Sequence, residues 1–342
     1  LTHTNLVVNA LNAVAGIGFN GDTTYIHSGP MFHLADTAST FAVTMATGRH
    51  VFVPRFDPVD TLAAIQAEKV TNATLVPTMV NMVVNHPRFA EFDVSSLKLV
   101  LYGASPMPEG VIRKAMAVMP RVRFMHAYGM TEAAPIVTLL DPRYTTLEGP
   151  YAGKHKSCGQ TAHSVEVKVV DADRRELPRG TPGELAIRGA NIMKGYWNKP
   201  DATAAVLEDG WYYSGDGAYM DDEGFVYIVD RLKDMIISGG ENVYSAEVEN
   251  AISLIPEVAE VAVIGVPDKR WGERVHAIVV RKAGTTLTAE QVIAHCHAQI
   301  AGYKCPKSVD FRDMPLLLSG AGKILKRELR EPYWKGLAKA VN

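Results

Sequence analysis

The sequence predicts an α/β protein in which a layered α/β subdomain is followed by a small β-barrel-like subdomain and then by a C-terminal α+β domain. Three observations support this prediction. Short apolar strands alternate with helix-like segments up to about residue 149, closely spaced strands and glycine turns occupy residues 150–230, and strands mix with two helices thereafter. Alternation of strands and helices is typical of a parallel sheet covered by helices. The chain of 342 residues is also long enough for two or three domains.

The first 149 residues contain most of the predicted helices. Apolar residues recur at helical spacing over residues 4–15 and stop at Gly16, which predicts a helix with a C-terminal glycine. Asp57 before Pro58 is typical of a helix cap followed by proline in the first turn. The predicted strands are residues 23–26, 50–53, 73–76, 97–102 and 122–125, and the other predicted helices are residues 34–47, 58–69 and 108–118.

The pattern changes after Gly149. Turns of the Gly-Asp, Pro-Gly and Glu-Gly type separate β-rich segments here, which predicts a β subdomain over residues 150–230. Past Arg231 the chain is predicted to form a compact α+β domain of its own. The predicted strands of these two parts are residues 165–170, 183–187, 224–229, 235–237, 258–266 and 275–280, and the predicted helices are residues 246–254 and 289–300.

Composition excludes several classes of protein. The chain has 35 Lys+Arg against 37 Asp+Glu, and this balance gives no reason to expect nucleic-acid binding. Polar residues interrupt the apolar runs before they reach the length of a transmembrane segment, and the N-terminus lacks the pattern of a signal peptide. Three widely spaced cysteines, Cys158, Cys296 and Cys305, suggest neither a disulfide framework nor a zinc site. We therefore expect a cytoplasmic protein.

Two motifs in the first 230 residues have the chemistry of a nucleotide site. Tyr128-Gly129-Met130-Thr131-Glu132 directly follows a predicted strand, where Thr131 can donate to a phosphate oxygen and Glu132 can hold Mg²⁺, which prefers oxygen ligands. The carboxylate of Asp216, predicted on a tight turn between strands, can accept both hydroxyls of a ribose. Taken singly, each motif is also explained by a helix cap or an ordinary Gly-Asp turn.

Two further motifs lie in the last part of the chain. A charged segment over residues 230–234 precedes the glycine pair Gly239-Gly240, a pattern typical of a domain junction beside a loop that is closely approached, or of a solvated surface hairpin. Near the C-terminus, glycines flank Lys323, whose ammonium can stabilise negative charge developing on a phosphoryl or carboxyl group. The latter segment lacks the spacing of a nucleotide P-loop.

The order and spacing of the four motifs together resemble the acyl-adenylate-forming (AMP-binding) superfamily, in the branch of bacterial fatty-acyl-CoA and aryl-CoA ligases. The connecting segments Gly183-Glu184-Leu185, Gly195-Tyr196-Trp197 and Trp271-Gly272-Glu273 share this resemblance, which covers essentially the whole chain. It implies a large N-terminal domain made of residues 1–149 and 150–230, a hinge at residues 231–233 and a mobile C-terminal lid at residues 234–342.

The resemblance also implies roles for individual residues. The adenine is expected between Gly103-Ala104-Ser105 and the ring of Tyr128, with Gly129 beside it; His126 stands where relatives commonly present an amide to the adenine edge. Thr131 matches the phosphate-binding threonine and Glu132 the magnesium ligand. The ribose is expected at Asp216 and Arg231 with Ile228 packed nearby, the hinge at Lys233, the pantetheine tunnel at Gly239, Gly240 and Glu241, the adenylation lysine at Lys323, and the junction of acyl pocket and thiol tunnel at His33.

The activity implied by these matches is ATP-dependent ligation of a carboxylic acid to coenzyme A. ATP and Mg²⁺ activate the acid as an acyl-adenylate, and CoA then takes the acyl group. The segments expected to line the acyl pocket, residues 35–40 and 133–137, carry small and apolar residues without arginine, which favours an apolar acid such as a fatty acid over a dicarboxylate. Three alternatives remain: an aryl-CoA ligase of the benzoate or cinnamate type, an adenylation domain that does not use CoA, and a non-catalytic fragment.

The N-terminus leads to a further expectation. The resemblance places a Ser/Thr/Gly-rich loop that grips the β- and γ-phosphates immediately before Leu1, together with an earlier α/β subdomain. We therefore expect an N-terminally truncated chain that is nearly inactive alone, binds AMP better than ATP and forms homo-oligomers through an exposed apolar face.

Overall fold

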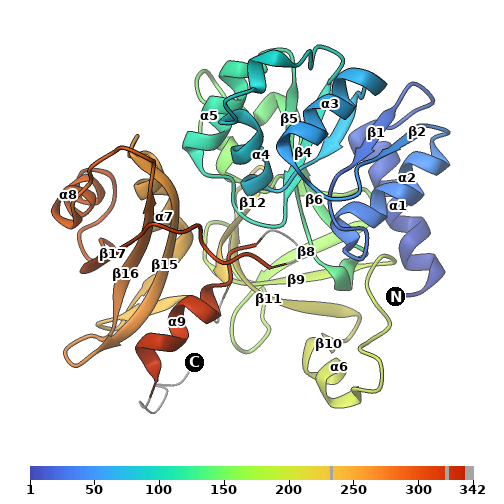
Figure 1. Cartoon of the computed structure of the whole chain (residues 1–342). Helices are drawn as coiled ribbons and strands as arrows, with labels where there is room; N and C mark the ends of the chain where they lie inside the picture. Colours follow the sequence, from blue (N-terminus) through green and yellow to red (C-terminus); the bar gives the residue numbers. More distant parts are fainter. Residues whose placement is uncertain (232–233, 320–322, 336–342) are drawn as a thin grey trace. The chain divides into compact units, whose positions relative to one another are not determined.

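A computed structural model describes residues 1–231, with Arg231 by its backbone alone, and residues 234–319 and 323–335 (Figure 1). The chain divides into two compact units. The first contains residues 1–107 and 111–228, and the second contains residues 108–110 and the described residues from Val229 onward. The first unit combines a helix-covered sheet with a smaller β-sheet, and the second is an α+β unit, so the predicted fold class is confirmed.

The large sheet of the first unit has the strand order β2-β1-β3-β4-β5-β6-β7. Strands β1 to β5 pair in parallel, as predicted. The sheet departs from the predicted parallel pairing at one edge, because β6 runs antiparallel to both β5 and β7. Only a short turn separates β5 from β6, whereas a parallel crossover needs a dozen or more residues. The strands are β1 (Thr24–His27), β2 (Arg49–Phe52), β3 (Asn72–Thr74), β4 (Leu99–Gly103), β5 (Arg123–Gly129), β6 (Ile136–Leu140) and β7 (Gln160–Thr161).

Alternate residues of the central strands point into two different cores. In β4, Leu99 and Leu101 pack with α1 and α2, whereas Val100 and Tyr102 pack with α3, α4 and α5 (Figure 1). Each helix thus covers one face of the sheet with its apolar side. The helices are α1 (His3–Ile17), α2 (Leu34–Met45), α3 (Pro58–Glu68), α4 (Pro77–Val84) and α5 (Glu109–Val118).

The predicted helix boundaries hold in one case and shift in another. The side chain of Asp57 accepts the backbone N–H of Val59 at 2.8 Å, so α3 begins at the predicted cap. The first helix, in contrast, runs through Gly16 and ends at Gly18, whose φ of 83° is the left-handed conformation that favours glycine. Helix α4 was not predicted.

The smaller sheet of the first unit has the order β10-β11-β9-β8, with β12 paired to β11. The prediction that Asp216 lies on a turn between strands is wrong. Asp216 lies inside β11, where the register with β9 shifts between Tyr213 and Gly217. Gly215, the glycine of the predicted turn, therefore belongs to a bulge. The elements are β8 (Val165–Val170), β9 (Gly183–Gly189), α6 (Pro200–Val206), β10 (Leu207–Glu208), β11 (Trp211–Met220) and β12 (Val226–Arg231).

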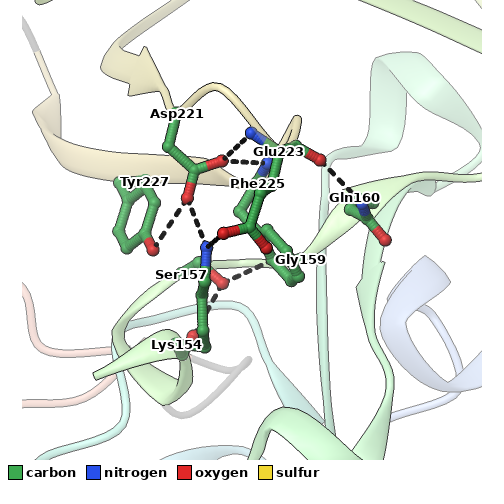
Figure 2. Close-up of polar contacts among 8 residues, drawn as sticks. All are labelled: Lys154, Ser157, Gly159, Gln160, Asp221, Glu223, Phe225 and Tyr227. Atoms are coloured by element: carbon green, nitrogen blue, oxygen red, sulfur yellow. Dashed lines mark hydrogen bonds and ion pairs between the residues drawn. The ribbon is translucent and has the colours of Figure 1, made fainter. Parts of the chain in front are cut away.

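A cluster of polar contacts joins the two sheets of the first unit (Figure 2). The ammonium of Lys154 lies 2.7 Å from Asp221 and 3.2 Å from Glu223, at the β11–β12 turn, and 4.2 Å from the centroid of the Phe225 ring. Lys154 belongs to a short 3₁₀ turn, Lys154–Lys156. The backbone carbonyl of Lys154 accepts a hydrogen bond from the hydroxyl of Ser157. The cluster therefore fixes the backbone around Ser157.

The second unit contains a five-stranded sheet in the order β14-β13-β16-β15, with β17 parallel to β16. Gly239 and Gly240 form the two-residue turn of the β13–β14 hairpin, with φ values of 64° and 86°, which a glycine pair adopts without strain. Strand β17 and helix α9 were not predicted. The elements are β13 (Ile236–Ser238), β14 (Glu241–Val243), α7 (Ser245–Ser253), β15 (Val258–Asp268), β16 (Gly272–Arg281), α8 (Ala289–Gln299), β17 (Ser308–Arg312) and α9 (Lys326–Trp334).

Candidate functional site

Several predicted nucleotide residues lie at the carboxyl ends of two neighbouring parallel strands. Gly103, the last residue of β4, pairs with Ala127 of β5, so Ala104 and Ser105 follow β4 beside residues 126–129. In open α/β sheets this edge is where ligands bind. The prediction that Tyr128 and Gly129 follow the strand is wrong: they are its last two residues, because pairing with β6 extends β5.

Tyr128 and Asp216 come together although 88 residues separate them. The Tyr128 hydroxyl donates to Oδ2 of Asp216 at 2.7 Å, and Asp216 is 9% exposed. Burial raises the pKa of Tyr128 well above its usual value, and the charge of Asp216 adds to this effect. Ile228 packs against the same apolar cluster as Tyr128. The two side chains predicted to hold adenine and ribose therefore lie side by side.

His126 lies in β5, two residues before Tyr128. Its ring stacks on that of Tyr102, with centroids 4.9 Å apart and an interplanar angle of 7°. Burial lowers the pKa of His126 to about 4, so the imidazole is neutral at pH 7. Nδ1 lies 3.1 Å from the carbonyl oxygen of Ser157 and must donate to it, because a carbonyl only accepts. Ser157, in the segment that Lys154 anchors, thus holds the neutral ring with its proton on Nδ1.

Glu132 has a partner that the sequence prediction missed. Thr131 and Glu132 lie in a short 3₁₀ turn after β5, with Thr131 exposed. The Tyr196 hydroxyl donates to Oε1 of Glu132 at 2.8 Å, and the carbonyl of Glu132 accepts the N–H of Met193. The only sequence signal for Tyr196 was its place in the connecting segment Gly195-Tyr196-Trp197.

The residues around Glu132 fit a magnesium ion that is shared with a nucleotide. Across the part of the chain that the structure describes, no three His, Cys, Asp or Glu side chains group as a metal site. Mg²⁺ is commonly held by one or two carboxylates plus substrate phosphates rather than by an all-protein cage. A single oriented carboxylate such as Glu132 suits that mode of binding.

His33 lies at the start of α2, where it is the N-cap residue and partly buried. A histidine cluster that was not predicted from the sequence contacts the first turn of the same helix through Asp36. Nδ1 of His27 is 2.9 Å from Asp36 of α2, and Nε2 of His27 is 2.9 Å from Nδ1 of His50. Asp36 belongs to the segment expected to line the acyl pocket, but its carboxylate is buried and paired within the protein.

The second unit contains the remaining predicted residues. Lys323 precedes α9, and its carbonyl accepts the N–H of Ser319 at 2.7 Å, beside an isolated antiparallel bridge between Leu318 and Ile324. Gly239 and Gly240 form the β13–β14 turn, and Glu241 is the first residue of β14. The side chain of Arg231 and the whole of Lys233, predicted at the ribose and the hinge, lie outside the described residues.

Comparison with known proteins gives concordant results. The sequence pattern of the AMP-binding enzyme family matches residues 1–197, and that of the AMP-binding enzyme C-terminal domain matches residues 247–323. Feruloyl-CoA synthase of an Amycolatopsis species is 42% identical over 97% of this chain and 66% of the relative. A long-chain-fatty-acid–CoA ligase of Escherichia coli is 38% identical over 97% of this chain and 58% of the relative. ATP-bound MatB of Rhodopseudomonas palustris has a TM-score of 0.87 and 34% identity over 98% of this chain and 65% of that structure.

This chain therefore spans between 58% and 66% of the length of these proteins. Across its described residues, no helix is both long and apolar enough to cross a membrane.

Proposed function

The chain belongs to the AMP-binding enzyme family, and on this premise we propose that the protein is an AMP-forming acid–CoA ligase. It would join an apolar carboxylic acid to coenzyme A through an acyl-adenylate. The observation that carries the proposal is the hydrogen bond of 2.7 Å between Tyr128 and Asp216, the two residues expected to hold adenine and ribose. We also propose a cytoplasmic location, which is supported by three buried cysteines in the free thiol form.

In the first step, the residues of the first unit bind and orient the nucleotide. The ring of Tyr128 supports the adenine, and Asp216 accepts the ribose hydroxyls. Thr131 donates to a phosphate oxygen, and Glu132, oriented by Tyr196, holds the magnesium–phosphate complex. When bound, Mg²⁺ supplies positive charge at the phosphate oxygens. These contacts matter because an anionic carboxylate must approach an α-phosphate that is itself negatively charged.

Two loops of the second unit serve the two steps in our proposal. The ammonium of Lys323 stabilises the charge that develops during adenylate formation. The Gly239-Gly240 turn and the adjoining Glu241 line the path of the pantetheine thiol during transfer to CoA. Rotation of the second unit about the hinge at residues 231–233 exchanges the two loops.

The proposed acid is a fatty acid. Ala133 and Val137, in one of the segments expected at the acyl pocket, are fully buried among apolar side chains. An aryl acid is the second candidate, favoured by the 42% identity to a feruloyl-CoA synthase.

A panel of acids tests both the reaction and the substrate. The full-length protein is incubated with ATP, Mg²⁺ and fatty acids of increasing chain length, or with cinnamate-type acids, with and without CoA. We expect acid-dependent pyrophosphate release, with AMP as the nucleotide product and thioester only when CoA is present. Release of ADP would contradict the proposed chemistry, and a preference for the aryl acids would select the second candidate. AMP formation without thioester would show that the protein activates the acid for an acceptor other than CoA.

A further inference from the structure

One buried carboxylate in the second unit contacts both segments that carry its proposed functional loops. Glu273 lies near the start of β16 and is 5% exposed. Its Oε2 accepts the backbone N–H of Ile237 at 3.2 Å. Its Oε1 accepts from the guanidinium of Arg330 in α9. The two oxygens of one side chain therefore bind two segments far apart in the sequence.

The first partner leads directly to the glycine turn. Ile237 is in β13, immediately before Ser238 and the Gly239-Gly240 turn. The residues preceding Glu273 extend this contact, since Gly239 donates its N–H to the carbonyl of Trp271 at 2.8 Å and Ser238 pairs with Gly272. The position of the turn is thus set by the start of β16.

The second partner leads to Lys323. Helix α9 begins at Lys326, three residues after Lys323, and three of its residues at helical spacing contact the body of the unit. Lys326 lies 2.6 Å from Glu249, Arg330 pairs with Glu273, and the indole of Trp334 donates to the carbonyl of Gly265 at 3.0 Å. These contacts hold one face of α9. They therefore fix the start of the helix, which lies three residues after Lys323.

The neighbouring strand leaves room for this carboxylate. A Cβ atom placed on Gly265 of β15 would lie 2.6 Å from Oε2 of Glu273, so any larger residue there would push the carboxylate from its place. A buried carboxylate is tolerated only when it is paired and hydrogen-bonded. Glu273 meets this condition through Arg330 and Ile237 together.

We propose that Glu273 is a positioning residue that fixes the Lys323 helix and the Gly239-Gly240 turn to one another within the second unit. The inference rests on the proposed function, which gives these two loops separate roles in the two steps. Because both loops depend on Glu273, its loss slows both steps. Arg330 is the partner of Glu273 on α9, whereas Ile237 is its partner on β13. Loss of Arg330 therefore slows adenylation alone.

The test measures the two steps separately, by single-turnover adenylate formation and by transfer of a preformed adenylate to CoA. Loss of a hydrogen bond to a charged group corresponds to a rate decrease of about 10- to 100-fold. We expect Glu273→Gln to slow both steps by that factor and Arg330→Met to slow adenylation only, with Arg330→Lys partly restoring it. Glu290→Gln, the same chemical change on the exposed start of α8, is the matched control and should leave both rates unchanged.

Reference variants separate failure of this inference from failure of the proposed function. Lys323→Ala should slow only the first step and Gly240→Leu only the second; if they do not, the proposed roles of the loops are wrong. If the references behave as expected, the inference is overturned by a folded Glu273→Gln that slows one step or neither, or by an Arg330→Met that slows both equally. Should Glu273→Gln fail to fold, Gly265→Ala displaces the same carboxylate without removing it. Slowing of both steps would support the inference, and unchanged rates would overturn it.

Discussion

The partly buried imidazole of His126 makes the stability of the first unit depend on pH. Its pKa is lowered by burial from 6.5 to about 4, an effect that the Ser157 carbonyl only partly opposes. In the unfolded chain the pKa of histidine is about 6.5. Between these two values the unfolded state binds more protons than the folded state, so stability falls as the pH falls from 6.5 to 4.

The size of the effect follows from the two pKa values of His126. At pH 5 the unfolded imidazole is almost fully protonated and the folded one is not, which amounts to about 2 kcal/mol of lost stability. The assay is urea unfolding at pH 7 and pH 5 of the wild type and of His126→Gln, whose amide can still donate to Ser157. Taking the difference between the proteins removes the contribution of the carboxylates. We expect the wild type to lose about 2 kcal/mol more than the variant; equal losses would refute the assignment of a buried neutral histidine.

Substitutions at three further positions test other contacts. Glu132→Gln should weaken Mg²⁺-dependent adenylation, with part of the rate recovered at high magnesium; an unchanged rate at limiting magnesium would remove this residue from the metal site. Lys326→Met should lower the free energy of unfolding of the second unit by about 1.5–3 kcal/mol, because it removes the ammonium from the partly buried Glu249, which keeps the N–H of Val263. Lys326→Arg should restore most of this, and an equal loss in both variants would contradict the ion-pair argument. Gly240→Leu, at a φ of 86°, should keep acid-dependent pyrophosphate exchange and lose CoA-dependent turnover; loss of both would indicate a misfolded unit.

The elements predicted correctly are those with a clear apolar pattern. Helix α3 combines an apolar face with a cap at Asp57, and strands β1, β4 and β8 lie close to their predicted positions. Helix α9 was missed because residues 326–334 are mostly charged and contain Pro332. Its attachment depends on ion pairs and a single buried leucine, Leu329, rather than on an apolar stripe. Strand β6 was missed because it is a continuous buried run without alternation.

The candidate site, like the fold, could be predicted only in part from the sequence. Tyr128, Asp216 and Glu132 could be identified because their motifs resemble those of a known family. Their partners could not, since Tyr196 meets Glu132 across 64 residues and only the folded chain shows the pairing. Glu273 is a similar case: a single carboxylate in a connecting segment has no motif of its own, and its two contacts come from strand β13 and helix α9.

The central claim is that one adenylate-forming site is served in turn by two loops of the second unit. The most direct test is Lys323→Ala in the full-length protein, studied in single-turnover reactions that start either from acid and ATP or from preformed acyl-adenylate and CoA. Our proposal predicts that adenylate formation slows by orders of magnitude while acyl transfer to CoA remains nearly intact, since the ammonium acts only in the first step. If acyl transfer falls as much as adenylate formation, Lys323 serves both steps and the proposal that two loops exchange is wrong.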